Sequence, residues 1–162
     1  MKNKAIFLDR DGILIRERGD WTWRPEDCEI LPGVFDALKK FRQKKYLLIV
    51  ISNQSGIDLK LYSHDDTEKV HQHLQSQFSE YGVRLDEIYY CPHHPTVGKC
   101  LCRKPDSVLF EKAIARFNLD VSRSFMIGDR ERDIAAAEKV GVRGFLAEPN
   151  RPLPEVLDKF AL

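Results

Sequence analysis

The sequence predicts an α/β fold: a doubly wound, mostly parallel sheet of about five strands, covered by helices on both faces. Short apolar runs alternate along the chain with longer segments whose apolar residues recur every three or four positions. The short runs are apolar at successive positions, which is typical of parallel strands buried on both faces. Polar and charged residues follow several of these runs directly, at the edge where open parallel sheets bind their ligands.

The elements of the first half follow in a regular order. Residues 4–8 form a short apolar run that ends in charged residues, as a buried strand does. The segment 32–45 opens on Pro-Gly, carries one apolar face and ends in a basic run, which predicts a helix. Residues 46–51 are apolar on both faces and predict the clearest strand. The segment 63–82 starts with a serine that can cap a helix and ends in glycine, and residues 88–90 predict a third strand.

The second half repeats the alternation. Residues 109–117 predict a helix because their apolar positions recur at helical spacing. Residues 124–127 predict a fourth strand, and the Gly-Asp pair after it leads into a helix that ends near Gly141. Residues 142–146 predict a fifth strand and residues 154–160 a short last helix. Strands that alternate with helices in this way build parallel βαβ units.

Length and composition bound the class of protein. The chain of 162 residues suits one domain, and without a repeat or a linker we expect residues 1–162 to form it. The net charge of +1 gives no broad electrostatic footprint for nucleic acid or an anionic membrane. Neither a membrane span of ~20 apolar residues nor a signal peptide is visible, so we expect a cytoplasmic protein.

Residues with the chemistry of a metal and phosphate site follow the predicted strands. They are Asp9 and Asp11 after the first strand, Ser52 and Asn53 after the second, Asp129 after the fourth, and Arg103 and Lys104 in a loop. Magnesium prefers hard oxygen ligands, usually one or two carboxylates together with phosphate and water. Carboxylates gathered without a cation repel one another, so either a metal binds or one of them is protonated. Singly, these aspartates fit ordinary loops or a helix N-cap equally well, and the argument rests on their combination.

The same residues resemble, in order and spacing, the four motifs of the haloacid dehalogenase (HAD) superfamily of phosphatases. The matching segments are residues 7–12, residues 52–54, Lys104 and residues 128–133, and their order and spacing agree over nearly the whole chain. The resemblance implies a Rossmann-like sheet and an enzyme, a phosphoric monoester hydrolase. Only about twenty residues separate Asp11 from Pro32, so we expect a capless member with an open site.

The resemblance also implies a two-step mechanism. Asp9 would attack phosphorus and form an aspartyl-phosphate. Asp11 would protonate the leaving oxygen and then take a proton from the attacking water. Magnesium would be held by the carboxylates of Asp9 and Asp129 and by the backbone carbonyl of Asp11. The expected ligands of the phosphoryl group are Ser52, Asn53, Arg103 and Lys104, whereas Asp133 is expected to support its loop.

A second metal site is predicted in the loop of residues 91–102. Its four candidate ligands are Cys91, His93, Cys100 and Cys102, a Cys₃His set that suits a closed tetrahedral zinc site. Because protein would fill all four positions, this zinc would be structural and would fix the loop that leads to Lys104. The alternatives are reduced loop cysteines or a disulfide. Cys28 is isolated in the sequence and is expected to be a small core residue.

This loop narrows the resemblance to the zinc-bearing branch that includes D-glycero-D-manno-heptose 1,7-bisphosphate phosphatase and the histidinol-phosphate phosphatase domain. It implies a small phosphorylated sugar or polyol as substrate, first heptose 1,7-bisphosphate at its 7-phosphate, with histidinol phosphate as the alternative. Residues 58–60 are Asp-Leu-Lys where the heptose enzymes typically have Ala-Arg-Gly, and the Pro-Gly-Met segment after Arg-Lys-Pro is also missing. A substrate-reading arginine is therefore absent unless Lys60 or Arg16 replaces it.

Two other classes of function remain to be weighed. A phosphoacceptor switch like a response-regulator receiver is also phosphorylated on an aspartate. That family places its acidic pair and its phosphoacceptor aspartate on different strands, whereas Asp9 and Asp11 here belong to one Asp-x-Asp motif. A nucleic-acid end phosphatase or zinc-dependent binding module would need basic and aromatic residues that the neutral chain does not group together. We therefore expect a monomer that acts on a small metabolite. Trp21 and Trp23 either frame the substrate or pack their loop, and His71 is expected on a helix surface or at a helix cap.

Overall fold

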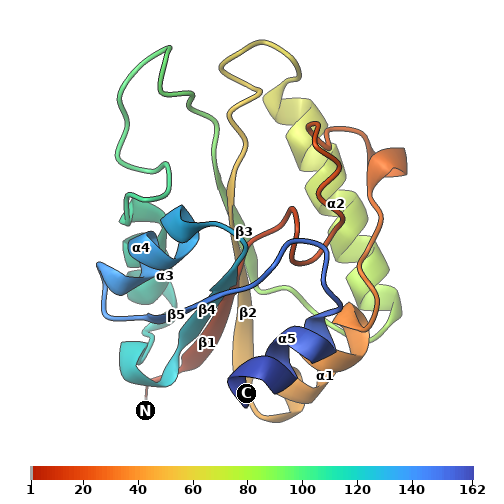
Figure 1. Cartoon of the computed structure of the whole chain (residues 1–162), viewed down its shortest axis with the longest axis vertical. Helices are drawn as coiled ribbons and strands as arrows, with labels where there is room; N and C mark the ends of the chain where they lie inside the picture. The colour runs from red at the N-terminus through yellow and green to blue at the C-terminus, as the bar shows by residue number, and fades with distance from the viewer. Residues whose placement is uncertain (1) are drawn as a thin grey trace.

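The computed structural model describes residues 2–162 and contains one five-stranded sheet in the order β3-β2-β1-β4-β5 (Figure 1). Its strands are β1 (Lys4–Leu8), β2 (Tyr46–Asn53), β3 (Glu87–Cys91), β4 (Phe125–Gly128) and β5 (Arg143–Leu146). Every neighbouring pair of strands is parallel. The predicted fold class is therefore confirmed.

Helices connect the strands and cover both faces of the sheet. They are α1 (Val34–Gln43), α2 (His64–Glu80), α3 (Val108–Phe117), α4 (Glu131–Glu138) and α5 (Leu153–Phe160), with 3₁₀ turns at Pro25–Asp27 and Val121–Arg123. Helices α1, α2 and α5 lie on one face, and α3 and α4 lie on the other (Figure 1). The observed bounds follow the sequence pattern closely, although α4 stops at Glu138 rather than near Gly141.

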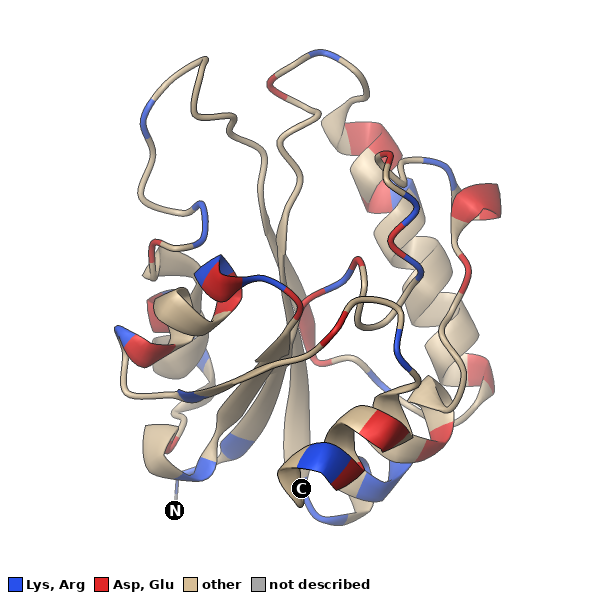
Figure 2. Ribbon diagram, viewed as in Figure 1, with Lys and Arg blue, Asp and Glu red and all other residues tan. Residues whose placement is uncertain are grey.

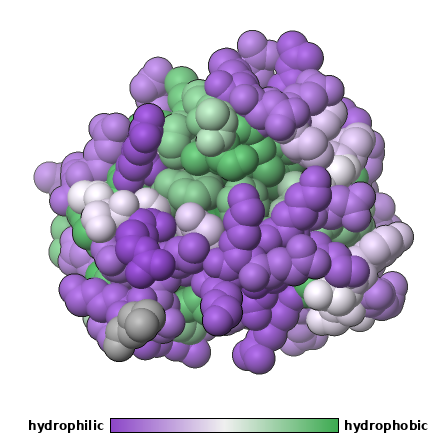
Figure 3. All heavy atoms as spheres, turned by 90° about the horizontal axis from the view of Figure 1, so that it is seen from below, coloured by the Kyte–Doolittle hydropathy of each residue, from purple (hydrophilic) through white to green (hydrophobic). Residues whose placement is uncertain are grey.

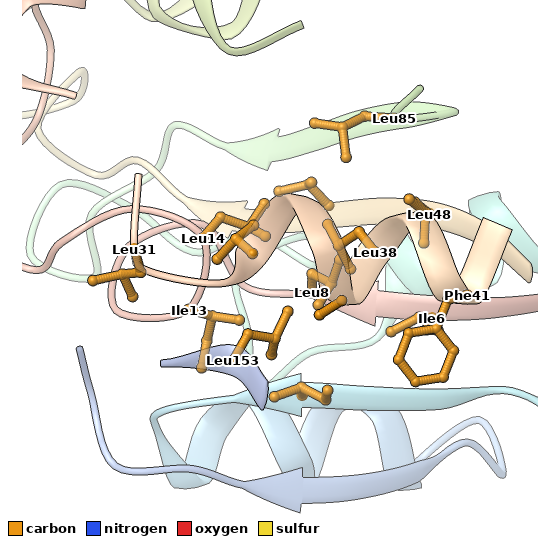
Figure 4. Packing of buried hydrophobic residues seen from close by; sticks show 14 of the residues in the cluster. Ile6, Leu8, Ile13, Leu14, Leu31, Leu38, Phe41, Leu48, Leu85 and Leu153 are labelled. Atoms are coloured by element: carbon orange, nitrogen blue, oxygen red, sulfur yellow. The ribbon is translucent and has the colours of Figure 1, made fainter. Parts of the chain in front are cut away.

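Strand β1 connects the two cores of the molecule. Ile6 and Leu8 belong to the cluster under α1, α2 and α5, whereas Ala5 and Phe7 belong to the cluster under α3 and α4. All four side chains are fully buried, and Figure 4 shows Leu8 near Leu38 and Ile6 near Phe41 in the first cluster. Burying a large apolar side chain contributes roughly 1.5–3 kcal/mol, so β1 is held from both faces. The residue that follows β1 is therefore fixed in space.

The expectation that His71 lies on a helix surface is wrong. Its side chain is only 5% exposed, because α2 packs against the sheet core with one face and also contacts the Pro25–Asp27 turn. The buried surface of α2 is therefore wider than its stripe of apolar residues, and it includes Thr67 and His71. The imidazole lies against the ring of Tyr90, with centroids 5.3 Å apart.

The face seen from below is mostly hydrophilic, with a large apolar area near its upper middle and smaller ones toward its edges (Figure 3). Among residues 2–162, no helix has the length and hydrophobicity that crossing a membrane requires.

Candidate active site

The carboxyl ends of the central strands open into a cavity of about 360 Å³. Six of the predicted site residues line it: Asp9, Asp11, Asn53, Arg103, Lys104 and Asp129. Acidic and basic segments after β1 and before α4 meet at this edge of the sheet (Figure 2). Ser52 does not line the cavity. It is 1% exposed, and its hydroxyl accepts a hydrogen bond at 2.7 Å from Nε2 of Gln54, which does line the cavity.

Asp9 is the first residue after β1. Its backbone N–H donates to Ile127 O on β4 at 3.1 Å, and its carboxylate accepts a hydrogen bond from Lys104 Nζ at 2.9 Å. Burial raises the pKa of Asp9 to about 8, because the lowering effect of Lys104 does not offset burial and the neighbouring carboxylates. A metal cation beside Asp9, in addition to Lys104, would favour the ionised form of this carboxylate.

Lys104 is a buried ammonium with three acceptors. Its Nζ donates to Asp9 Oδ1 at 2.9 Å and to Ile51 O at 2.6 Å, and it lies 2.8 Å from Asp133 Oδ1. Burial lowers the pKa of Lys104, but the two carboxylates raise it above the ordinary value. The side chain of Asn53 exchanges two hydrogen bonds with the backbone of Lys104, at 3.1 and 3.2 Å, and so holds its loop against β2.

Asp129 and Asp133 complete an acidic cluster with Asp9. One ligand atom from each of the three residues lies within 4.8 Å of the others. Both carboxylate oxygens of Asp129 are buried without a hydrogen-bond partner in the described part of the chain, and Arg130 Nε forms only a long ion pair with Oδ2, at 3.6 Å. A buried carboxylate without hydrogen bonds in an acidic cluster fits a bound cation, because a buried charge needs close partners. Asp133 instead accepts a hydrogen bond from Arg130 N at 3.0 Å, which agrees with a supporting role.

Gly12 makes room for this cluster. Its φ of +90° is a left-handed conformation that side chains disfavour. A Cβ atom at this position would lie 2.5 Å from Asp129 Oδ2. Glycine here allows the backbone after β1 to approach the carboxylate after β4.

Asp11 projects into the cavity from the loop after β1. Both of its carboxylate oxygens accept hydrogen bonds from the guanidinium of Arg10, at 2.9 and 3.1 Å. Gln54 Nε2 donates a further hydrogen bond at 3.1 Å. The motif pattern indicates Asp11 alone, since nothing in the sequence shows that Arg10 turns inward.

Comparison with known proteins agrees with this geometry. A family model described as HAD-hydrolase-like matches residues 101–159. The heptose 1,7-bisphosphate 7-phosphatase of Haemophilus ducreyi, named for the β anomer, is 41% identical over 149 residues, covering 88% of this chain and 81% of that protein. The Campylobacter jejuni enzyme, named for the α anomer, is 37% identical over 136 residues, which cover 84% of this chain and 77% of that protein. The chain belongs to this family of HAD-like phosphatases.

A solved structure extends the likeness to three dimensions. The D,D-heptose 1,7-bisphosphate phosphatase of B. bronchiseptica, determined with magnesium and phosphate, is 28% identical with a TM-score of 0.85. The match covers 96% of this chain and 86% of that one. The likeness therefore extends over nearly the whole fold of this HAD-like phosphatase.

The second predicted site of this HAD-like phosphatase also assembles. One ligand atom from each of Cys91, His93, Cys100 and Cys102 lies within 4.8 Å of the others. The closest pairs are Cys91 Sγ to Cys102 Sγ at 2.9 Å and His93 Nδ1 to Cys102 Sγ at 3.2 Å. The thiols are free rather than paired in a disulfide, and the donor set suits tetrahedral zinc. Arg103, next in the chain, donates a hydrogen bond to His93 O at 3.3 Å.

The two tryptophans after the first motif have different surroundings. Trp21 is 39% exposed and lines the cavity. Trp23 stacks on Tyr62, with ring centroids 6.5 Å apart and an angle of 4° between the rings. Of the two positions that the sequence leaves open for these tryptophans, Trp21 therefore lies at the cavity and Trp23 packs the loop.

Proposed function

We propose that this phosphatase removes the 7-phosphate of D-glycero-D-manno-heptose 1,7-bisphosphate in a magnesium-dependent reaction through an aspartyl-phosphate at Asp9. The observation that carries the chemistry is the acidic cluster, where Asp9 accepts a hydrogen bond from Lys104 and lies close to a buried Asp129 carboxylate that has no hydrogen-bond partner in the described residues. The names of the relatives, among them the 41% identical Haemophilus ducreyi enzyme, support the heptose bisphosphate over histidinol phosphate.

The residues that would hold magnesium are the carboxylates of Asp9 and Asp129 and the backbone carbonyl of Asp11. When bound, the ion would supply positive charge that balances the carboxylates and the phosphoryl oxygens. The solved relative that contains magnesium and phosphate supports this assignment. Asp133 is occupied by Lys104 and by Arg130 N, so we propose that it positions Lys104 rather than the ion.

The first chemical step belongs to Asp9 and Asp11. A carboxylate oxygen of Asp9 attacks phosphorus, and the bond from phosphorus to the sugar oxygen breaks. Asp11 gives its proton to that oxygen, which leaves as the sugar hydroxyl. Lys104 and Arg103 face the cavity as cations where negative charge builds up on the phosphoryl oxygens. Asn53 holds the Lys104 loop and contributes its amide to the same wall.

The second step regenerates the enzyme. Asp11, now a carboxylate, takes a proton from a water that attacks phosphorus. The bond between phosphorus and the Asp9 oxygen breaks, and inorganic phosphate leaves. Ser52 is buried behind Gln54, so we propose that it supports the cavity wall and binds phosphate only if its hydroxyl turns.

We also propose that Cys91, His93, Cys100 and Cys102 bind a structural zinc. All four donors come from the protein, which leaves no open position for a reacting water. The loop runs directly from Cys102 through Arg103 to Lys104. Zinc would therefore fix the direction from which Lys104 enters the site.

Phosphate release from a panel of phosphorylated metabolites tests the function. The panel contains both anomers of the heptose bisphosphate, histidinol phosphate, other sugar phosphates and a 3′-phosphorylated oligonucleotide. We expect one heptose anomer to be preferred and Asp9→Asn to abolish its turnover. Asp20→Asn is the matched control, since Asp20 lines the cavity mouth but only accepts a hydrogen bond from Trp21 N. Normal turnover in Asp9→Asn would refute the mechanism, and preference for another panel member would refute the substrate.

A further inference from the structure

Arg10 is a charged side chain that is buried as deeply as the apolar core. It is 1% exposed, yet the steps proposed above give it no part. Its Nε and Nη2 donate to the two carboxylate oxygens of Asp11, at 2.9 and 3.1 Å. This paired contact matches the planar fork of guanidinium to the plane of a carboxylate. The rotation of the Asp11 carboxyl is therefore set by Arg10.

Arg10 is in turn held by two groups from other segments. Its Nη2 donates to Thr22 O at 2.9 Å, and its Nη1 lies 3.4 Å from His71 Nε2. A guanidinium has donors only, so Nε2 must accept and the proton of the neutral imidazole must be on Nδ1. Burial lowers the pKa of His71 to about 3, with a further contribution from Arg10, so the imidazole stays neutral. His71 of α2 is thus connected to Asp11 through the side chain of Arg10.

Gln54 completes the arrangement from the other side. Its Nε2 donates to Asp11 Oδ2 at 3.1 Å, while its Oε1 accepts a hydrogen bond from Tyr62 at 2.8 Å. The side chain of Asp11 is 22% exposed and lines the cavity, while its carboxylate oxygens accept hydrogen bonds from the buried side chains of Arg10 and Gln54.

We propose that Arg10, oriented by His71, is a positioning residue that fixes the carboxyl of Asp11 for proton transfer to the leaving oxygen. The inference rests on the proposed role of Asp11. General acid catalysis contributes about 10²–10⁴ in rate and needs the donor within hydrogen-bond reach of the leaving oxygen. A carboxyl that loses its paired contact rotates freely about two bonds and spends less time in that geometry.

The test compares substrates that differ in their need for an acid. An aryl phosphate such as p-nitrophenyl phosphate leaves as a stable anion, whereas an alkyl phosphate needs a proton on its leaving oxygen. The value of kcat/KM covers only the steps up to departure of the leaving group, so it excludes the later role of Asp11 as a base. We expect Arg10→Lys to reduce kcat/KM for the alkyl phosphate at least about tenfold more than for the aryl phosphate. Asp11→Asn should show the same selectivity, and the double variant should add little to it.

His71 provides the second arm, because Arg10→Lys places a different cation in a buried site and can fail to fold. His71→Leu removes the acceptor for Arg10, while His71→Gln keeps an amide oxygen that can accept. We expect the first to shift the alkyl-to-aryl ratio in the same direction as Arg10→Lys, by about threefold or more, and the second to restore much of it. Equal losses on both substrates in every Arg10 and His71 variant, with Asp11→Asn still selective, would overturn the positioning role. If Asp11→Asn is itself unselective, the proposed acid role has failed instead.

Discussion

Gly12→Ala tests whether the position of Asp129 determines cation binding. The new Cβ would lie 2.5 Å from Asp129 Oδ2 and 2.9 Å from Asp129 Cγ, where ordinary contact begins at 3.4 Å. Asp129 is 8% exposed, and its carboxylate can yield only by moving within the acidic cluster. The overlap is several times the tolerance of about 0.2 Å that a metal site allows in its bond lengths. The left-handed backbone at Gly12 adds a strain of about 1–2 kcal/mol.

We expect the magnesium concentration for half-maximal rate to rise at least about tenfold, which corresponds to ~1.4 kcal/mol. Gly82→Ala is the matched control, because Gly82 also has a positive φ, +71°, but nothing lies within 4 Å of its Cβ position. Its strain should lower the melting temperature by roughly 2–8 °C without changing the magnesium titration. A magnesium requirement in Gly12→Ala equal to that of the control would refute the reasoning.

Three further outcomes follow from the structure. Zinc removal or Cys102→Ser should lower the melting temperature and slow turnover, and zinc would be excluded if chelation changed neither. From pH 7 to pH 5 the free energy of unfolding in urea should fall by about 2 kcal/mol more for the wild type than for His71→Gln. The reason is that the imidazole of His71 binds a proton in the unfolded state, where its pKa is 6.5, but not in the folded state, where its pKa is about 3. Equal losses would contradict the buried neutral state of His71. Trp21→Ala should raise KM about threefold or more at nearly constant melting temperature, because Trp21 lines the cavity. Trp23→Ala should instead lower the melting temperature, because it loses the stack on Tyr62. The reverse pattern would exchange the roles of the two tryptophans.

The strand ends could be predicted because parallel strands read as apolar runs and their last residues share one edge. That rule places Asp9 and Asp129 beside each other although they are 120 positions apart in the sequence. Lys104 follows from the motif order and from the cysteines before it. The four candidate zinc ligands lie within twelve positions of the sequence, so their spacing predicts the cluster that the structure shows.

The residues around Asp11 could not be predicted in the same way. Arg10 lies between two aspartates and reads as a solvated loop charge, but its side chain turns into the protein. The partner that allows this, His71, comes from a helix 61 positions away and breaks no pattern in its own segment. Ser52 shows a further limit: its place in a motif predicts a phosphate ligand, but the sequence does not indicate that its hydroxyl accepts a hydrogen bond from Gln54. Periodicity indicates which face a residue occupies, but not which polar groups meet there.

The central position of β1 has a consequence for how the molecule opens and closes. β1 pairs on both sides, with β2 and with β4, and its residues Ala5 to Leu8 are fully buried. Its amides should therefore exchange their hydrogens only on global unfolding, while the loops at the cavity rim should exchange through local opening. Asp9 directly follows this buried strand, whereas Trp21 lies in a loop at the cavity and is 39% exposed. We therefore expect sequence changes at the rim to alter which molecules enter without loosening the carboxylate of Asp9.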